Sequence, residues 1–365
     1  MLNISRGMGH LGILGFALFV AEISTLNPLD MVRDPNYPRT ESFDVYWNIP
    51  TYLCKKHKID FEPQVKKYGI IVNKDDAFRG EKITILYDPG MFPIVVKDTT
   101  TGKYKEVNGG IPQLGDVNRH LEEFTKVIEK VVPKDFNGLC IIDFEAWRPA
   151  FRQHWREQAI YKNMSLELVR QKHPQWNEKQ IQEKAKEEFE AGAKVFMEGT
   201  LLHAKKLRPN AKWGYYGFPY CLNFGKGGSA ECPDLVKKEN DGIQWLFDAS
   251  QAFYLSLYSS KKLTPEQHKY FVTGRLNEAW RMAIKVSKEN PPKVYPYVWY
   301  RHHDDPGFLK EETMYNVLET TRKYKMGGAI IWGSSGELKT REQCQDLMNY
   351  LNTVLGPTVV KVKSN

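Results

Sequence analysis

Two acidic side chains lie close together at the end of a short apolar run in the middle of the chain. Leu139–Ile142 has the composition of a buried strand. Asp143 and Glu145 follow it, and on an extended backbone both carboxyl groups face the same side. Because neighbouring carboxylates repel each other, the less hydrated one has a raised pKa and holds a proton near neutral pH. Such a pair can supply the general acid that cleavage of a glycosidic bond requires.

That spacing is not specific by itself, because an Asp-x-Glu pair also occurs at solvated strand ends and in salt bridges. Its interpretation depends on the elements that position it. Short apolar runs alternate with amphipathic runs, and this alternation predicts parallel βα units. The expected strands are residues 43–47, 83–87, 139–142, 212–216, 294–300 and 328–332. The expected helices are residues 116–132, 178–208, 265–288, 310–325 and 341–355, while residues 245–258 fit either a helix or a strand.

Polar and aromatic side chains gather where the predicted strands end. They are Asn48, Asp88, Asp143, Glu145, Tyr216 and Trp332. In a (β/α) barrel the carboxyl ends of the strands carry the active site. We therefore predict a single α/β domain with a TIM-like barrel, and a doubly wound open sheet is the alternative. The open sheet lacks its phosphate-binding loop here, since Gly225–Gly228 lies between two cysteines and not between a strand and a helix.

Residues 1–24 have the composition of a secretory signal peptide. Arg6 supplies the positive charge, and Leu11–Val20 is an apolar core that is too short to span a bilayer. No later stretch is apolar enough to cross a membrane. We therefore predict a secreted protein whose mature domain spans residues 25–365. Asn163 begins an Asn-Met-Ser sequence and is a predicted glycosylation site in a secreted chain.

Secretion makes disulfides possible among the five cysteines. Cys221 and Cys232 enclose ten residues and form an easy local pair, while Cys54 and Cys344 lie near the two ends and can clasp a closed fold. Cys140 is left over in the apolar strand, where we expect a buried, inert thiol. No cysteine or histidine spacing indicates zinc, so no metal site is predicted.

Composition and charge fit several classes of ligand. Hydrophobic residues make up 41% and charged residues 26%, as in soluble globular proteins. Nine Trp and nineteen Tyr suit a groove that stacks on sugar rings, but also a large core. A net charge of +8 attracts nucleic acid, an anionic polysaccharide or a membrane surface if it is gathered on one face. The chain lacks a dense Lys/Arg cluster with interleaved aromatics, so a nucleic-acid or heparin binder ranks last, and no membrane partner is expected.

Several blocks of the sequence, in the same order, resemble the hyaluronidases of glycoside hydrolase family 56. The resemblance covers residues 41–358, and the motifs together are far more specific than any one alone. The blocks are Tyr46–Thr51 with Cys54, Tyr87–Gly90, Gly109–Gln113, Asp143–Pro149, Trp213–Pro219 with Cys221, Gly274–Arg275 and Ile331–Ser335. No Cys-rich module follows the barrel, and in this the chain is similar to the insect venom and salivary members of the family.

The resemblance implies a distorted (β/α) barrel of about seven strands, in agreement with the alternation of elements. It also implies endo-hydrolysis of β-1,4 N-acetylglucosaminide bonds in hyaluronan, with retention and without a metal or cofactor, and chondroitin is a further substrate to consider. The N-acetyl oxygen of the substrate would be the nucleophile, which is an exception to the two-carboxylate scheme. Glu145 would protonate the leaving oxygen and later deprotonate water. Asp143 would help to hold that proton and to position the acetamido group.

The resemblance assigns roles to further residues, and each has a structural alternative. Tyr216 and Tyr258 would donate hydrogen bonds to the acetamido group, or simply pack after their strands. Trp332 would wall the pocket for the acetamido methyl group, or belong to the core. The expected substrate-binding residues are Tyr87, Asp88, Arg148, Arg275, Ser334 and Ser335. The ordinary alternative is a barrel salt bridge for the two arginines and a strand end for the two serines.

Two segments of the chain depart from the family pattern. His302 and His303 follow a strand, but adjacent side chains on an extended chain point to opposite sides and do not make a metal site. Tyr220 stands where mammalian relatives have an acidic residue, which concerns the pH optimum and subsite preference and not the reaction. The main hypothesis is an active secreted hyaluronidase, monomeric, with a role as a spreading factor in venom or saliva. The alternative is a catalytically silent glycan-binding or allergen-type protein on the same barrel.

Overall fold

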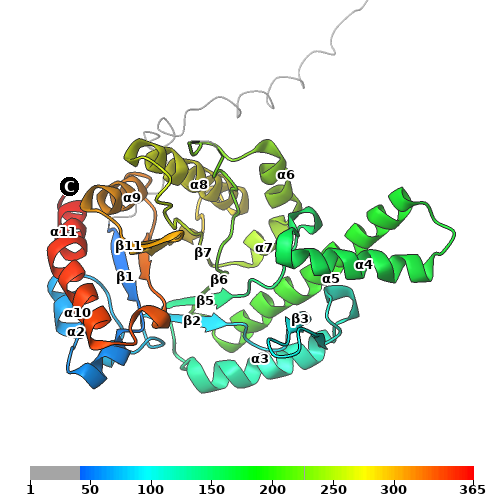
Figure 1. The fold of residues 1–365 in the computed structure, drawn as a ribbon, viewed down its shortest axis with the longest axis horizontal. Helices are drawn as coiled ribbons and strands as arrows, with labels where there is room; N and C mark the ends of the chain where they lie inside the picture. Colours follow the sequence, from blue (N-terminus) through cyan, green and yellow to red (C-terminus); the bar gives the residue numbers. More distant parts are fainter. Residues whose placement is uncertain (1–41, 226) are drawn as a thin grey trace, which may run out of the picture. The chain divides into compact units, whose positions relative to one another are not determined.

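The computed structural model describes residues 42–225 and 227–365. The predicted signal peptide, residues 1–24, lies outside the described residues. In the described part, parallel strands form a barrel and helices surround it (Figure 1). Among these described helices, none is long and apolar enough to cross a bilayer.

Two parallel sheets of three strands form most of the barrel wall. The first has the order β2 (Ile83–Tyr87), β5 (Leu139–Asp143) and β6 (Lys212–Tyr215). The second has the order β1 (Asp44–Asn48), β12 (Gly328–Trp332) and β9 (Tyr297–Trp299). Strand β5 is central in the first sheet, which places the end of the Asp143 strand between two neighbours.

Shorter contacts join the two sheets on one side. Strand β7 (Ala252–Phe253) pairs with β8 (Lys293–Val294), and parallel bridges link Tyr216 to Tyr254 and Ser256 to Tyr297. The predicted strand 294–300 is interrupted at Pro296, which has no N–H to donate to a neighbour. With β8 and β9 counted as one interrupted strand, the described residues contain seven parallel strands, which confirms the predicted barrel.

A side-chain amide completes the ring between β1 and β2. Ile71 pairs with β1, because Ile71 N–H donates to Val45 O at 2.8 Å and Trp47 N–H donates to Ile71 O at 2.8 Å. Asn73, two residues later, is fully buried. Its Oδ1 accepts from Ile83 N at 3.1 Å and its Nδ2 donates to Ile83 O at 2.9 Å. The amide of Asn73 thus imitates a strand neighbour for β2.

Side chains alternate between the barrel interior and the layer beneath the helices. On β5, Leu139 and Ile141 belong to the interior cluster and Asp143 continues that series, whereas Cys140 and Ile142 pack in the outer layer. The buried interior residues are Ile83, Ile85, Leu139, Ile141, Ala252, Tyr254, Tyr295, Tyr297 and Ile330. The partly buried residues packed against them are Tyr46, Phe78, Tyr216, Tyr258 and Trp332. The interior is therefore a packed core with an aromatic layer against it.

Five of the helices were predicted. They are α3 (Val117–Val131), α5 (Glu178–Leu207), α8 (Pro265–Val286), α9 (Glu311–Lys323) and α10 (Arg341–Tyr350). The starts of α5, α8 and α10 are fixed by capping boxes, in which Asn177, Thr264 or Thr340 exchanges hydrogen bonds with a Gln three residues later. The last predicted helix, 341–355, is longer than expected. Its α-helical part ends at Tyr350, and a π-helical turn (Leu351–Leu355) leads into α11 (Gly356–Ser364).

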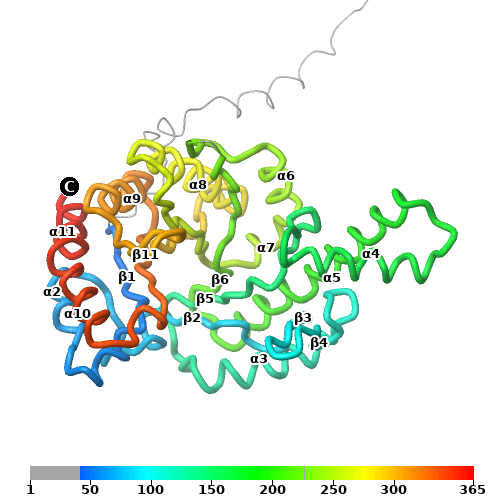
Figure 2. Tube along the Cα trace, in the orientation of Figure 1, coloured from blue at the N-terminus to red at the C-terminus, as the bar shows by residue number. Residues whose placement is uncertain are grey.

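Other elements were not predicted, or, for residues 245–258, were predicted only as either a helix or a strand. Residues 151–176, which show no clear pattern, contain α4 (Ala159–Lys172), and α4 packs along α5 as a hairpin that extends away from the barrel (Figures 1 and 2). Residues 245–258 contain both a helix, α7 (Gln244–Ala249), and strand β7. The remaining elements are α2 (Glu62–Lys67), α6 (Asp234–Gly242) and two hairpins, β3 (Ile94–Lys97) with β4 (Tyr104–Val107) and β10 (Arg301–His302) with β11 (Asp305–Phe308).

The disulfide prediction is confirmed. Cys54 is bonded to Cys344, with a Cα–Cα distance of 5.8 Å, and Cys221 to Cys232, with 4.9 Å. Cys140 is a free, buried thiol, and burial raises its pKa well above the usual value. A thiol that resists ionisation in this way is a poor nucleophile, as expected.

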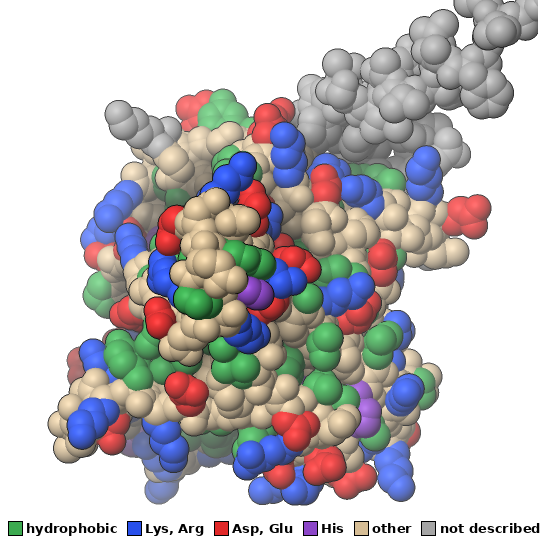
Figure 3. Space-filling view, turned by 90° about the vertical axis from the view of Figure 1, so that its right-hand side faces the viewer, with side chains coloured by type: hydrophobic (Ala, Val, Ile, Leu, Met, Phe, Trp, Pro, Cys, Tyr) green, Lys and Arg blue, Asp and Glu red, His purple; other side chains and the backbone are tan. Residues whose placement is uncertain are grey.

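The net charge of +8 is not concentrated on the face that carries the tip of the α4–α5 hairpin. There, Lys and Arg side chains are interspersed with Asp and Glu (Figure 3). Ion pairs along the hairpin, such as Lys184 with Glu187 at 3.2 Å and Arg170 with Glu178 at 2.9 Å, account for this mixture. This pattern is typical of solvated helix faces and not of a polyanion-binding surface.

Candidate active site

The Asp143 carboxyl group lies at the end of β5, among the side chains that fill the barrel. It is partly buried, while Glu145, two residues beyond, is exposed. Asp88, just after β2, lies alongside, and its N–H donates to Asp143 O at 2.9 Å. Asp88 adopts a φ of +42°, an uncommon conformation for a residue other than Gly. The ends of two neighbouring strands thus bring three carboxyl groups together.

Asp143 and Glu145 share a hydrogen bond between their side chains. Burial, followed by the negative charges of Glu145 and Asp88, raises the pKa of Asp143 to about 8. Burial also raises the pKa of Glu145, against the opposing effect of the Arg148 charge. The pair therefore retains one proton near neutral pH, as a coupled carboxyl pair does. Their hydrogen bond raises the pKa of Asp143 and lowers that of Glu145, so Asp143 is the protonated donor, and Glu145 faces the solvent.

Two tyrosines stand beside the carboxyl pair. The ring centroids of Tyr216 and Tyr258 are 6.1 Å apart, and the two hydroxyl groups are linked by a hydrogen bond. The ring of Tyr297 packs edge-on against Tyr216 at 5.3 Å. Burial, aided by nearby negative charge, raises the pKa of both Tyr216 and Tyr258 well above the usual range. Both hydroxyl groups therefore stay protonated and can donate hydrogen bonds. The structure brings Tyr258 beside Tyr216, while a hydrogen bond from either tyrosine to a substrate stays a prediction.

Trp332, at the end of β12, belongs to an aromatic wall. Its ring stacks on Tyr258 with centroids 5.6 Å apart and meets Trp299 edge-on at 5.2 Å. Its Nε1 donates to the hydroxyl oxygen of Tyr87 at 3.1 Å, and Tyr87 in turn stacks on Phe78. Tyr87 is 43% exposed, so this wall is open to a ligand on one side.

The two arginines have different surroundings. The Arg148 guanidinium lies over the rings of Tyr220 and Trp155, 4.6 and 5.0 Å from their centroids. Its positive charge lowers the pKa of Glu145, against the effect of burial. Arg275 donates to Ser256 O and to Asn223 Oδ1 and packs on two phenylalanine rings. Burial lowers the pKa of Arg275 to about 10. Within residues 42–225 and 227–365 neither arginine forms an ion pair, so the structure does not support the salt-bridge alternative.

The serines after β12 already have partners. Ser334 Oγ accepts from Gly336 N at 3.1 Å and caps a short 3-10 helix (Ser335–Glu337), whose Glu337 accepts from Ser334 N at 3.1 Å. Ser335 is exposed. The strand-end role of Ser334 is therefore visible, while substrate binding by either serine stays a prediction.

Several side chains around the site were not predicted from the sequence. Trp299 and Tyr297 come from the strand that Pro296 interrupts, and Trp155 lies in the segment to which no element was assigned. Asn48 was noted only as a strand-end residue, yet its Oδ1 accepts from the buried Tyr297 hydroxyl at 3.1 Å. Alternation along the strand 294–300 was the available indication, because Tyr295, Tyr297 and Trp299 share one face.

No group of three or more His, Cys, Asp or Glu in the described part of the chain can hold a metal ion. His302 and His303 point to different neighbours, as predicted. The His302 ring lies 6.4 Å from that of His268, and the His303 ring lies 5.5 Å from Phe224. The predicted glycosylation site, Asn163, is exposed on α4, and glycosylation stays a prediction.

Comparison with known proteins decides the family. The model of glycoside hydrolase family 56, described as hyaluronidase, matches residues 32–365. The chain belongs to this family. It is 40% identical to the hyaluronidase of Apis mellifera over 368 residues, covering 100% of this chain and 95% of the relative. It is 42% identical to hyaluronidase A of Vespula vulgaris, over 88% of this chain and 96% of that protein.

Solved structures agree with the family. The crystal structure of bee venom hyaluronidase in complex with a hyaluronic acid tetramer matches this barrel with a TM-score of 0.84 and 41% identity, covering 88% of this chain and 99% of that one. Among the relatives is also the inactive hyaluronidase B of Vespula vulgaris, 39% identical over 88% of this chain and 94% of that protein. Overall similarity therefore does not distinguish active from inactive members, and the catalytic residues must do so.

Proposed function

We propose that the chain is an active endo-hydrolase of hyaluronan that cleaves β-1,4 N-acetylglucosaminide bonds with retention. The observation that carries the proposal is the hydrogen-bonded pair of Asp143 and Glu145 with a raised pKa, beside two neutral tyrosine hydroxyls. An inactive member is expected to have lost the acid or its partner. This chain retains both.

Glu145 is the general acid and base. A sugar chain that covers the exposed Glu145 removes water from it, and desolvation favours its protonated form, so the shared proton moves from Asp143 to Glu145. Glu145 then gives the proton to the leaving glycosidic oxygen. The acetamido oxygen of the N-acetylglucosamine whose glycosidic bond is cleaved attacks the anomeric carbon of that sugar and forms a cyclic oxazolinium ion. Water next opens that ring, gives its proton to Glu145 and restores the pair.

Positioning is the main task of the remaining residues, since the nucleophile is already attached to the substrate. Asp143, returned to its charged form, faces the acetamido N–H. Tyr216 and Tyr258 orient the acetamido group through their hydroxyls, and Trp332 walls the pocket for its methyl group. Tyr87, Asp88, Arg148, Arg275 and the two serines are proposed to contact the sugar hydroxyls and uronate carboxylates.

The bee venom complex with a hyaluronic acid tetramer supports hyaluronan as the substrate. Secretion is supported by the composition of residues 1–24 and by the two disulfides. A secreted hyaluronan hydrolase loosens tissue matrix, and a role as a spreading factor in venom or saliva would follow.

The test separates the proposed enzyme from a silent glycan-binding homologue. The secreted, disulfide-bonded protein is incubated with hyaluronan at several acidic and neutral pH values, and the anomer formed first is followed by NMR. We expect shortened chains whose new ends are β-anomers at early times. Binding of hyaluronan without cleavage at any pH would favour the silent homologue. New ends that are initially α-anomers would contradict the retaining mechanism.

A further inference from the structure

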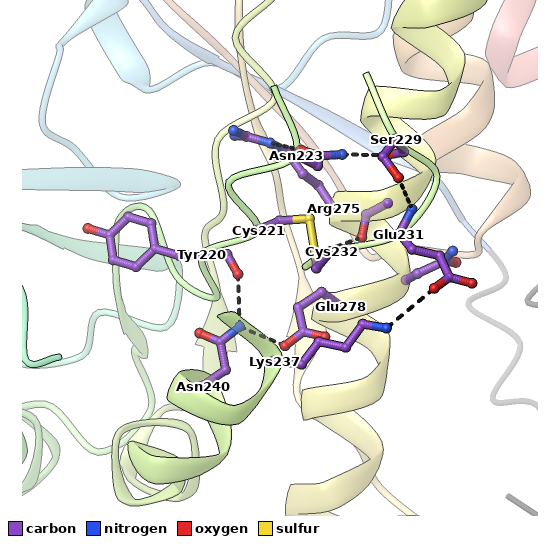
Figure 4. Close-up of a disulfide and its surroundings, with 12 residues drawn as sticks. Tyr220, Cys221, Asn223, Ser229, Glu231, Cys232, Lys237, Asn240, Arg275 and Glu278 are labelled. Atoms are coloured by element: carbon purple, nitrogen blue, oxygen red, sulfur yellow. Dashed lines mark hydrogen bonds and ion pairs between the residues drawn. A yellow bond between two sulfur atoms is a disulfide. The ribbon is translucent and has the colours of Figure 1, made fainter. Parts of the chain in front are cut away.

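Helix α6 carries a buried asparagine whose amide faces the loop after β6. Asn240 is fully buried, and its Nδ2 donates to Tyr220 O at 2.8 Å and to Glu278 Oε1 at 2.6 Å (Figure 4). Its Oδ1 has no partner among the residues that the structure describes. Burying a polar group costs free energy unless the group is hydrogen-bonded. The two hydrogen bonds donated by Nδ2 offset this cost and fix the orientation of the amide.

The acceptor on the other side of Asn240 is a buried carboxylate. The Glu278 side chain on α8 is 1% exposed and accepts two hydrogen bonds from Arg281, at 2.7 and 2.8 Å. Arg281 is tied in turn to Asp241 of α6 at 2.7 Å. A buried charge needs close partners on all sides, and this network fixes the oxygen to which Asn240 donates. Asn240 is thus anchored to α8 by its hydrogen bond to Glu278, and its other hydrogen bond fixes the backbone of Tyr220.

Tyr220 transmits this constraint to the active site. Its backbone carbonyl accepts a hydrogen bond from Asn240, and the centroid of its ring lies 4.6 Å from the guanidinium carbon of Arg148. The next residue, Cys221, is tied to Cys232. In Figure 4 the Tyr220 ring points away from the disulfide and from α8. A guanidinium is attracted to the face of an aromatic ring, so its position depends on where that ring is held. The hydrogen bond from Asn240 to Tyr220 O therefore helps to set where the Arg148 charge lies.

A second contact from α6 reaches the same arginine. Glu239, next to Asn240, pairs with Arg152 and accepts from Gln153 Nε2 at 2.8 Å. Gln153 O in turn accepts from Arg148 Nη1 at 3.5 Å. Glu239 and Asn240 therefore hold Gln153 and Tyr220, and both of these contact the Arg148 guanidinium.

We propose that Asn240 and Glu278 are positioning residues for the general acid: through Tyr220 they hold the Arg148 charge beside Glu145. The charged groups that face Glu145 are Asp143, Asp88 and Arg148. Arg148 opposes the two aspartates and keeps the proton on Glu145 transferable. The proposal rests on the hydrolase function proposed above. A parent protein that does not cleave hyaluronan would refute that function, whereas the tests below concern an active parent.

The test is the pH profile of kcat/KM on hyaluronan for Asn240→Leu, which keeps the side-chain shape and removes both donors. When Arg148 moves away, the pKa of Glu145 rises, because a nearby cation favours the carboxylate. The alkaline limb of the profile, where the acid loses its proton, should therefore move to higher pH, and kcat/KM at the optimum should fall about tenfold. Asp234→Asn is the matched control. It breaks the ion pair to Lys237 on the exposed side of the same helix but forms no hydrogen bond with Tyr220 or with the Glu278–Arg281 pair, and its profile should equal that of the parent.

A double-mutant cycle tests the route through Tyr220. Tyr220→Leu should shift the same limb in the same direction, and Asn240→Leu added to it should produce no further shift. An unshifted limb in folded Asn240→Leu, an equal shift in Asp234→Asn, or additive shifts in the double variant would overturn the proposal. If Asn240→Leu does not fold, Glu278→Gln is measured in its place, since it keeps an acceptor and removes only the charge. It should give a smaller shift in the same direction, and an unshifted profile would equally refute the proposal.

Discussion

Asp143 and Glu145 differ in role because their surroundings differ, although their sequence spacing suggests an equivalent pair. Asp143 is partly buried in the barrel mouth, and its pKa is raised to about 8, while Glu145 is exposed and lies in the field of Arg148. The sequence indicated that one carboxyl group would hold a proton but not which one. That depends on how deep each lies and on Asp88 and Arg148, whose proximity arises only in the folded barrel.

Asp143→Asn should therefore change both rate and pH profile. In the parent, loss of the last proton leaves two negative carboxylates side by side, which holds that proton to higher pH. With a neutral amide in place of Asp143 this repulsion is absent, so the alkaline limb of kcat/KM moves to lower pH. We expect kcat to fall at least about 100-fold. Both are measured by release of reducing ends between about pH 3 and 10, with Asp346→Asn, at an exposed position on α10, as the control. An unmoved alkaline limb would show that the two carboxyl groups do not share the proton.

Among the elements, those with long regular patterns were predictable and those fixed by single contacts were not. Helices α3, α5, α8, α9 and α10 have amphipathic periods, three of them with capping boxes, and the strands have apolar runs. Helix α6 is short, and two of its residues, Glu239 and Asn240, hold distant loops. The closure of β1 onto β2 by the amide of Asn73 likewise leaves no local trace, because its partners are defined only by the barrel.

Asn73→Leu tests whether that amide closes the barrel. The change removes the acceptor of the Ile83 and Lys82 N–H groups and one of the two donors to Ile83 O, which keeps Gly80 N–H, so the free energy of unfolding in urea should fall by about 2–4 kcal/mol. Asn118→Leu, at an exposed position on α3, should change it by less than about 0.5 kcal/mol. Equal stability of Asn73→Leu and the parent would mean that water or a backbone shift satisfies β2 as well as the amide does.

At the scale of the whole molecule, the two disulfides constrain very different lengths of chain. Cys54–Cys344 spans 290 residues and Cys221–Cys232 spans 11. In the chain-entropy model the longer loop restricts the unfolded state more, so replacing the first pair by alanines should cost about 6 kcal/mol and the second about 3 kcal/mol. Unfolding in guanidinium measures both, with Cys140→Ala as a reference for the loss of a cysteine that is not bonded. A larger loss for the shorter pair would contradict the entropic account.

The barrel itself was predictable from the order of strands and helices, and the family from linked motifs across nearly the whole chain.

The family includes at least one inactive relative, so the central claim is that this chain cleaves hyaluronan with Glu145 as its acid. The most direct measurement is the release of new reducing ends from hyaluronan by the parent and by Glu145→Gln, which removes the transferable proton with little change of shape. We predict activity in the parent and a loss of at least about 100-fold in the variant. Comparable activity in both proteins, or none in the folded, disulfide-bonded parent, would contradict the account.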